Sequence, residues 1–141
     1  MSLKDKIAII TGGSRGIGKT VVKSLAEAGC KVVAFSIVSQ DLQNTQEELL
    51  RDGLHIEIEK VDVSDYEQAQ KAINAVAQKF GTVDILVNAA GIYGPIGLFR
   101  DNEIKKWSEA LQVNLIGTVN CTHAVLPIMM ENKAGKIINF S

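Results

Sequence analysis

The sequence predicts an α/β fold in which helices cover both faces of a parallel sheet. Short apolar segments alternate with amphipathic helical segments along all 141 residues, the connections between them are short, and a glycine-rich turn joins the first strand to the first helix. Right-handed crossovers between parallel strands then place helices on both faces of the sheet. Because there is no internal repeat, low-complexity tract or linker, we expect residues 1–141 to form a single domain.

The predicted strands are short, and glycine or polar residues border them. Lys6–Thr11 is nearly all apolar, which is typical of a strand buried on both faces of a parallel sheet. His55–Lys60 alternates apolar and polar residues, as an exposed or half-buried strand does. In chain order the predicted strands are Lys6–Thr11, Lys31–Ser36, His55–Lys60, Val83–Asn88 and Lys136–Phe140.

Four helical segments lie between these strands. Ile17–Ala28 and Gln40–Asp52 are each followed by a glycine, which commonly ends a helix. Ser64 and Glu67 have the spacing of a capping box and predict the start of a third helix. The fourth pattern covers Asn102–Asn132, and we expect Pro127 to end or kink this helix, because proline lacks the N–H that the helix requires.

Composition excludes several classes of function. A formal net charge of −1 provides no global field that would recruit nucleic acid or an anionic membrane. The two cysteines, Cys30 and Cys121, lie in apolar surroundings and suggest neither a disulfide framework nor a metal site. No apolar run approaches the roughly 18 residues of a membrane span, and the start of the chain lacks the apolar core of a signal peptide, so we expect a cytoplasmic protein.

The turn after the first strand, Thr11–Gly18, is rich in glycine. Glycines at 12, 16 and 18 permit a tight turn, close approach of the backbone to a pyrophosphate, and close packing of helix on sheet. The N–H groups at the start of the helix would then face the phosphates. A structural turn is the alternative, but a position between a buried strand and a helix favours nucleotide binding.

The same residues also fit the phosphate loop of nucleoside triphosphatases. Gly13–Thr20 matches G-x-x-x-x-G-K-T, in which Lys19 would contact phosphate and Thr20 would hold magnesium. A strand ending in an acid should accompany that loop, yet Val83–Asn88 ends in asparagine. We therefore retain the triphosphatase only as the weaker hypothesis.

Four motifs together resemble the short-chain dehydrogenase/reductase family, and the resemblance covers the whole chain. They are Thr11-Gly12-x-x-x-Gly16-x-Gly18, Asp62 within Val-Asp-Val, Asn88-Ala89-Ala90-Gly91, and Asn114 within Val-Asn-Leu. The resemblance implies a Rossmann-like sheet of about five strands in the order 3-2-1-4-5, without the last strands of the full fold. It also implies an oxidoreductase that transfers hydride between a nicotinamide and a carbonyl or alcohol substrate.

The resemblance assigns roles to individual residues. Asp62 would contact adenine, although it could instead cap the turn before Ser64, and Asn114 would hold a water of the proton relay in a disturbed helix, unless it simply faces solvent. Asn88 and Gly91 would lie in the crevice at the carboxyl ends of the strands. The expected cofactor-binding residues are Gly12, Ser14, Arg15, Gly16, Ile17, Gly18, Ser36, Asp62, Val63, Asn88, Ala89, Ala90 and Gly91, and the expected catalytic residue is Asn114.

The residue at the end of the second strand bears on the choice of cofactor. NAD enzymes usually have an acid there to bind the ribose 2′-hydroxyl, and this chain has Ser36. Arg15 resembles the basic glycine-loop residue of family members that prefer NADP(H), whereas Ile37 occupies the position where many of them have a second arginine. We therefore favour NADP(H) over NAD(H).

The family's tyrosine and lysine are not found in these residues. Tyr66 is followed four residues later by Gln70 and Tyr93 by Gly97, so neither forms Tyr-x-x-x-Lys, and by alignment the family's serine would come directly after Ser141. We therefore expect the 141-residue chain to be inactive, to be part of a longer protein, and to form a homo-oligomer through exposed apolar faces. A naturally short, non-catalytic dinucleotide-binding module is the alternative.

Overall fold

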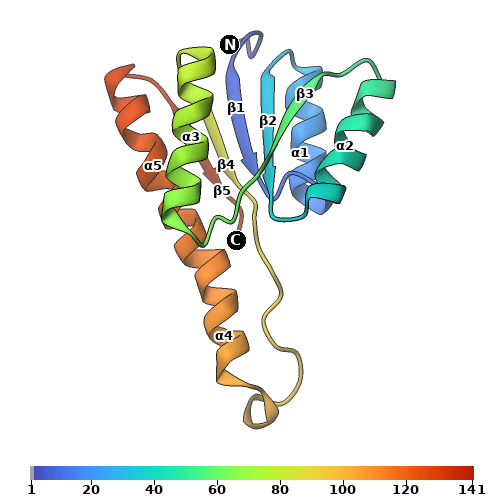
Figure 1. The fold of residues 1–141 in the computed structure, drawn as a ribbon, viewed down its shortest axis with the longest axis vertical. Coiled ribbons are helices and arrows are strands. Elements are labelled where there is room, and N and C mark those ends of the chain that lie inside the picture. The colour runs from blue at the N-terminus through green and yellow to red at the C-terminus, as the bar shows by residue number, and fades with distance from the viewer. Residues whose placement is uncertain (1) are drawn as a thin grey trace.

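The computed structural model describes residues 2–141 as one five-stranded sheet with helices on both faces (Figure 1). The strands lie in the order β3-β2-β1-β4-β5, and every neighbouring pair is parallel. This architecture confirms the predicted fold class and strand order. The strands are β1 (Ile7–Thr11), β2 (Lys31–Ser36), β3 (Ile56–Lys60), β4 (Ile85–Asn88) and β5 (Lys136–Asn139).

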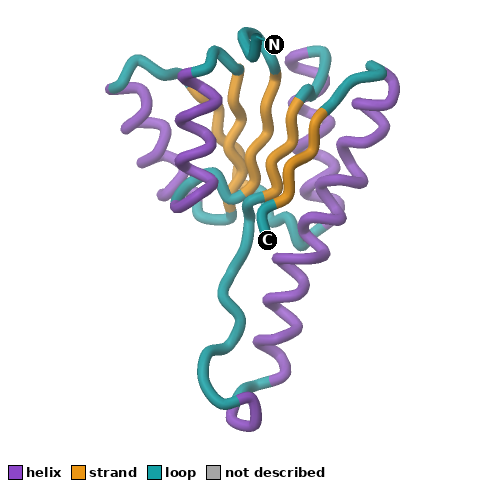
Figure 2. The backbone as a smooth tube through the Cα atoms, turned by 180° about the vertical axis from the view of Figure 1, so that it is seen from behind, coloured by secondary structure: helices purple, strands orange, loops and turns teal. Residues whose placement is uncertain are grey.

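Alternate residues of the central strands face opposite layers of helices. Ile7 and Ile9 of β1 belong to the core formed with α3 (Tyr66–Phe80) and α5 (Gly117–Glu131). Ala8 and Ile10 belong to the core formed with α1 (Gly16–Glu27) and α2 (Ser39–Arg51). Because all five residues of β1 are buried, the strand has no polar alternation, as its sequence predicted. Figure 2 shows the two helix layers flanking the strands from behind.

Helix α3 begins one residue later than the capping-box prediction required. Asp65, not Ser64, is the N-cap, and its Oδ1 accepts hydrogen bonds from the backbone N–H groups of Glu67 (3.0 Å) and Gln68 (3.2 Å). The bond from the Gln68 N–H is the main reason that the pKa of Asp65 lies below its usual value. The Ser64 hydroxyl instead donates to Asp62 Oδ1 at 2.6 Å.

One long irregular helix replaces the predicted Asn102–Asn132 segment. After a single 3₁₀ turn, η1 (Phe99–Asp101), α4 (Ile104–Leu111) leads into a π-helical turn, η2 (Gln112–Ile116), and then into α5. Pro127 lies inside α5, and the helix continues to Glu131, so of the two predicted effects of the proline, ending the helix does not occur. The last turn stays anchored because Met129 is buried and Asn132 N–H donates to Ile128 O at 3.1 Å.

This long helix is apolar enough to cross a membrane by length and composition. It spans Ile104–Glu131, 28 residues, and contains an 18-residue window of mean hydropathy 1.3. The expectation that no apolar segment approaches this length was therefore too strong. The buried face of α5 (Cys121, Ala124 and Val125) packs in the same core as β1 and α3, which is how a helix of an α/β layer packs.

Candidate cofactor site

Three glycines give the loop after β1 its compact shape. Gly12 has φ +66°, and a Cβ there would lie 2.7 Å from Ala89 O, so only glycine lets the loop approach the end of β4. A Cβ on Gly18 would overlap Gly12 O, so α1 packs directly on the loop. Gly16 has φ +55° and nothing within 4 Å of the position of a Cβ. The loop therefore closes on itself at Gly12 and Gly18 and remains open at Gly16.

Helix α1 starts at this open position without a side-chain cap. Its N-cap, Arg15, makes no capping hydrogen bond with its side chain. The first N–H groups of a helix lack partners within the helix and carry part of the positive end of its dipole. Together with the open space at Gly16, this makes the start of α1 suited to an anionic phosphate, with the exposed Ile17 beside it.

The hydroxyl of Thr11 joins the glycine loop to the loop after β4. Thr11 Oγ1 accepts hydrogen bonds from Ala89 N–H and Ala90 N–H, each at 3.1 Å, and Thr11 is buried. One side chain thus satisfies two backbone donors that would otherwise lack partners at the end of β4. Sequence reasoning quoted Thr11 within its motif but gave it no role. The available signal was a hydroxyl residue that ends an otherwise apolar strand.

A small hydroxyl cluster lies between the glycine loop and the end of β2. Ser14 Oγ donates to Ser36 Oγ at 2.8 Å, and Val38 N–H donates to the same Ser36 oxygen at 3.3 Å. Buried Thr45 of α2 donates from its Oγ1 to Ser14 O at 2.8 Å and so supports the loop from below. The structure therefore brings Ser14 and Ser36, two of the predicted site residues, into contact. The sequence analysis did not identify Thr45, because a threonine within the largely polar α2 gives no sign that it contacts the glycine loop.

Arg15 extends from the loop toward the first turn of α2. Its Nε lies 3.8 Å from Asp41 Oδ2, and three quarters of the arginine side chain is exposed to solvent. A long, exposed contact of this kind contributes little to stability, so the guanidinium remains available to another anion. The sequence analysis did not identify Asp41 as an acidic neighbour of Arg15.

Asp62 lies in the turn after β3, between β3 and α3. Its Oδ1 accepts from Ser64 N–H at 2.9 Å and from Ser64 Oγ at 2.6 Å, so the turn-capping role foreseen as an alternative is present. The neighbouring Val63 is buried. Asn120 Nδ2 donates to Val63 O at 2.9 Å, and Gln112 Nε2 donates to Ser64 O at 3.3 Å. The turn is thus fixed from its far side by the long helix.

Asn88 is buried at the end of β4, opposite Asn139 in the register of β5. Its Nδ2 donates to Asn139 Oδ1 at 2.9 Å and to Thr122 Oγ1 at 3.2 Å. Among the described residues its Oδ1 has no hydrogen-bond partner. Asn88 therefore ties two strands to α5 at the edge of the crevice, and it is not an ordinary turn residue.

Asn114 lies in the π-helical turn and binds the backbone of the loop after β4. Its Oδ1 accepts from Ile92 N–H at 2.8 Å, and its Nδ2 donates to Ile92 O at 2.9 Å. A Cβ on Gly91 would lie 3.2 Å from Asn114 Oδ1, so Gly91 lets the loop pass close to the amide. The predicted disturbance of the helix at Asn114 is present as this π-helical turn, and the Asn114 amide, although the residue is exposed, bonds the backbone of Ile92.

The side chains required for a triphosphatase point elsewhere. Lys19 Nζ bonds Glu48 Oε2 of α2 at 2.6 Å, and Thr20 Oγ1 donates to Gly16 O at 3.2 Å. No cluster of three or more metal-binding side chains occurs within residues 2–141. The structure thus disfavours the triphosphatase hypothesis, because its lysine is already neutralised by a carboxylate.

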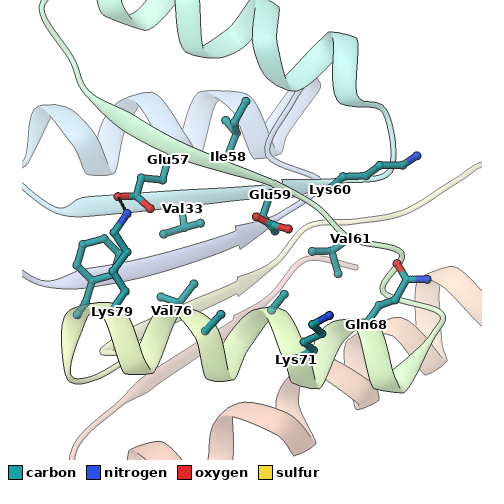
Figure 3. A pocket seen from close by; sticks show the side chains of 13 residues that line it. Val33, Glu57, Ile58, Glu59, Lys60, Val61, Gln68, Lys71, Val76 and Lys79 are labelled. Atoms are coloured by element: carbon teal, nitrogen blue, oxygen red, sulfur yellow. Dashed lines mark hydrogen bonds and ion pairs between the residues drawn. The ribbon is translucent and has the colours of Figure 1, made fainter.

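A groove between β3 and α3 lies away from these residues. It has a volume of about 440 Å³, with Val33, Val61 and Val76 among its apolar lining residues (Figure 3). Glu57 and Lys79 form an ion pair of 2.6 Å across one end of it. None of the predicted site residues lines this groove, so the crevice at the strand ends remains the candidate site.

Comparison with known proteins agrees with this geometry. The family described as short chain dehydrogenase matches residues 6–141. An uncharacterized oxidoreductase of Staphylococcus aureus (strain MW2) is 34% identical over 139 residues, which cover 99% of this chain and 59% of the relative. The 3-oxoacyl-acyl-carrier-protein reductase FabG of Vibrio cholerae is 37% identical over 139 residues, with 99% and 55% covered.

Solved structures show the same arrangement. A short-chain type dehydrogenase/reductase from Mycobacterium ulcerans superposes with a TM-score of 0.94 at 26% identity, covering all of this chain and 52% of that one. The structure of gox2181 superposes with a TM-score of 0.93 at 32% identity, covering 99% and 55%. The chain thus spans just over half the length of the proteins it matches.

Proposed function

The chain belongs to the short-chain dehydrogenase family, and from this membership we propose that it binds a nicotinamide dinucleotide across the carboxyl ends of β1, β2 and β4. The observation that carries the proposal is the junction of two loops there. Gly12 fits only without a side chain against Ala89, and the Thr11 hydroxyl bonds Ala89 and Ala90. These contacts leave the start of α1 open toward a diphosphate.

The residues at the ribose end support a preference for NADP(H). Ser36 Oγ already accepts from Ser14 Oγ and Val38 N–H, so its own proton is left to donate outward. A donor suits the oxygens of a 2′-phosphate, whereas NAD enzymes place a carboxylate there to accept from the 2′-hydroxyl. Arg15, held only loosely by Asp41, would add a charge-assisted bond to the phosphate.

For the whole protein we propose an oxidoreductase that acts on a small carbonyl or alcohol substrate. The bound nicotinamide would supply or accept the hydride, and the chain's own residues would orient it between the glycine loop and the loop at Asn88–Gly91. Within the 141 residues neither Tyr66 nor Tyr93 has a lysine four positions later. We propose that these residues alone bind the dinucleotide without catalysing turnover.

A fluorescence titration of the 141-residue chain tests the proposal. NADPH is expected to bind more tightly than NADH, and MgATP is expected not to compete. Replacing Arg15 by alanine should weaken NADPH binding by about tenfold, as expected for loss of a charge-assisted bond, with NADH changed less than about twofold. Arg51→Ala, an exposed arginine at the end of α2, is the matched control and should change neither dissociation constant.

Two results would contradict the proposal. If MgATP binds firmly while both nicotinamide dinucleotides leave the folded protein unchanged, the site is not a dinucleotide site. If these 141 residues reduce carbonyl substrates with NADPH after their mass has been checked, the proposed lack of turnover is wrong.

We also propose that the chain self-associates through the long helix. Leu111, Leu115 and Val119 are each more than half exposed and lie on successive turns of the helix. A row of exposed apolar side chains favours association over a solvated surface. Gel filtration should give an apparent mass above that of one chain, and a stable monomer would contradict this proposal.

A further inference from the structure

The long helix touches both walls of the proposed crevice within three turns. On the nicotinamide side, Asn114 makes its two hydrogen bonds to the backbone of Ile92. On the adenine side, Asn120 binds Val63 O and Gln112 binds Ser64 O. The helix thus holds two loops that are far apart in the sequence but flank the same site.

The π-helical turn lies where the long helix presents side chains both to the loop after β4 and to the turn after β3. In η2, Gly117 N–H donates to Gln112 O, five residues back, instead of four as in an α-helix. The extra residue rotates everything that follows relative to α4. The Asn114 amide of this turn reaches the loop after β4, while Gln112 in the same turn and Asn120 beyond it reach the turn after β3.

The backbone of the helix also rests directly on the adenine-side turn. A Cβ on Gly117 would lie 2.6 Å from Val63 Cγ2, so the helix can approach Val63 only where it has no side chain. Asn120 is nine-tenths buried, and its Nδ2 supplies the bond to a carbonyl of a residue that is itself buried. Loss of this donor would leave Val63 O without its partner, which a buried peptide relieves by rotating.

We propose that Asn120, assisted by Gln112, is a positioning residue for the adenine end of the dinucleotide site, and that η2 fastens the adenine-side and nicotinamide-side walls to each other. This inference rests on the proposed dinucleotide function. Asn120 does not touch the cofactor. It acts by holding the Val63 peptide, and thereby helps to place the neighbouring Asp62 carboxylate, which accepts its hydrogen bonds from Ser64.

Two ligands separate the two walls experimentally. Adenosine 2′,5′-bisphosphate carries only the adenine half of the cofactor, and NADPH carries both halves. Asn120→Ala should raise the dissociation constants of both ligands by the same factor, about three- to tenfold, as expected for one hydrogen bond. Asn114→Ala should raise the dissociation constant of NADPH and leave the dissociation constant of the bisphosphate unchanged. The reason is that this substitution removes only the hydrogen bonds to the backbone of Ile92, on the nicotinamide side.

A matched control separates positioning from general stability. Asn132, just past the end of α5, donates from its Nδ2 to Thr82 Oγ1 at 2.9 Å, far from the crevice. Asn132→Ala removes a comparable bond and should leave both dissociation constants unchanged. Thermal unfolding of each variant without ligand shows how much stability is lost, and the dissociation constants are compared for the folded protein.

The outcomes distinguish the inference from the function on which it rests. If the unmodified chain binds both ligands and Asn120→Ala binds them equally well, the positioning role is wrong while the cofactor site stands. If the unmodified chain binds neither ligand, the proposed function fails and this inference fails with it. If Asn120→Ala does not fold, Gln112→Ala, at an exposed position, tests the same inference. It should raise the dissociation constants of both ligands by about two- to threefold, and unchanged values would contradict the positioning role.

Discussion

Strands β1 and β5 lie in the same sheet but in very different surroundings. Every residue of β1 is buried, between β2 and β4 and under helices on both faces. In β5 three of the four residues are exposed, and Ile138 keeps 48% of its surface accessible to solvent. Helix α4 resembles β5 in this respect, with Ala110 as its one buried residue, and Figure 1 shows α4 extending beyond the sheet.

This contrast in burial between β1 and β5 indicates where the described residues obtain their stability. The proposed cofactor site lies on the fully packed part of the sheet, since its loops leave from β1, β2 and β4. Apolar side chains of β5 and α4 are available for further contacts that these residues do not make among themselves. We therefore expect stability and cofactor binding to depend mainly on β1 and its neighbours.

A pair of isoleucine substitutions tests this contrast with the largest expected effect. Ile9→Ala in β1 should lower the free energy of unfolding by about 2–5 kcal/mol, because it leaves a cavity between packed layers. Ile138→Ala in β5 should cost less than about 1 kcal/mol, because the side chain is half exposed. Urea unfolding measures both, and equal losses would show that β5 is as well packed as β1.

The Thr11 hydroxyl should matter more than a hydroxyl on the exposed helix. Thr11→Val keeps the shape but leaves the N–H groups of Ala89 and Ala90 without their acceptor, at a cost of about 1–3 kcal/mol in the free energy of unfolding. Thr118→Val removes a hydroxyl that donates only to Asn114 O and serves as the control, with an expected change below about 0.5 kcal/mol. Indistinguishable unfolding midpoints for the two variants would refute the proposed junction.

The smallest effect concerns Cys121, which reports whether α5 is packed as tightly as β1. Burial raises the pKa of its thiol to about 12, so the folded state keeps the proton that the unfolded chain releases from about pH 8.5. Stability should therefore fall as the pH rises above this value, by about 1 kcal/mol at pH 9.5 relative to a Cys121→Ala variant. Cys30, whose pKa burial also raises, is present in both proteins and cancels.

Unfolding midpoints of the unmodified chain and of the Cys121→Ala variant, measured from pH 7 to pH 10, test this prediction. Parallel curves would show that the thiol is not held in a dry core. In that case α5 would belong with α4 and β5 rather than with β1.

The packed region was predictable from the sequence, because its signals are local. The apolar run of β1 and the glycines after it each require one structure, and both were found as predicted. The contacts that complete the site are long-range and carry no local signal. Thr45 bonding Ser14, and Asn114 bonding Ile92, each depend on where a helix meets a loop 22 or more residues away.

The start of α3 shows how a correct rule can choose the wrong residue. Ser64 and Glu67 fit the capping pattern, but Asp65 and Gln68 fit an equivalent one a residue later. The second pair forms because Gln68 Nε2 also donates to Asp65 Oδ2 at 3.0 Å, while Ser64 is bound to Asp62. The sequence contains both patterns, and only the partner at Asp62 decides between them.

The bond from Thr11 to the loop after β4 has a consequence for how a ligand enters. Its hydroxyl holds Ala89 and Ala90 against the glycine loop through contacts made entirely within the protein. Little chain entropy is then left to lose when a dinucleotide binds, since the receptor is already preorganised. The association rate of the dinucleotide should therefore be set by diffusional encounter and not by a slow rearrangement of the protein.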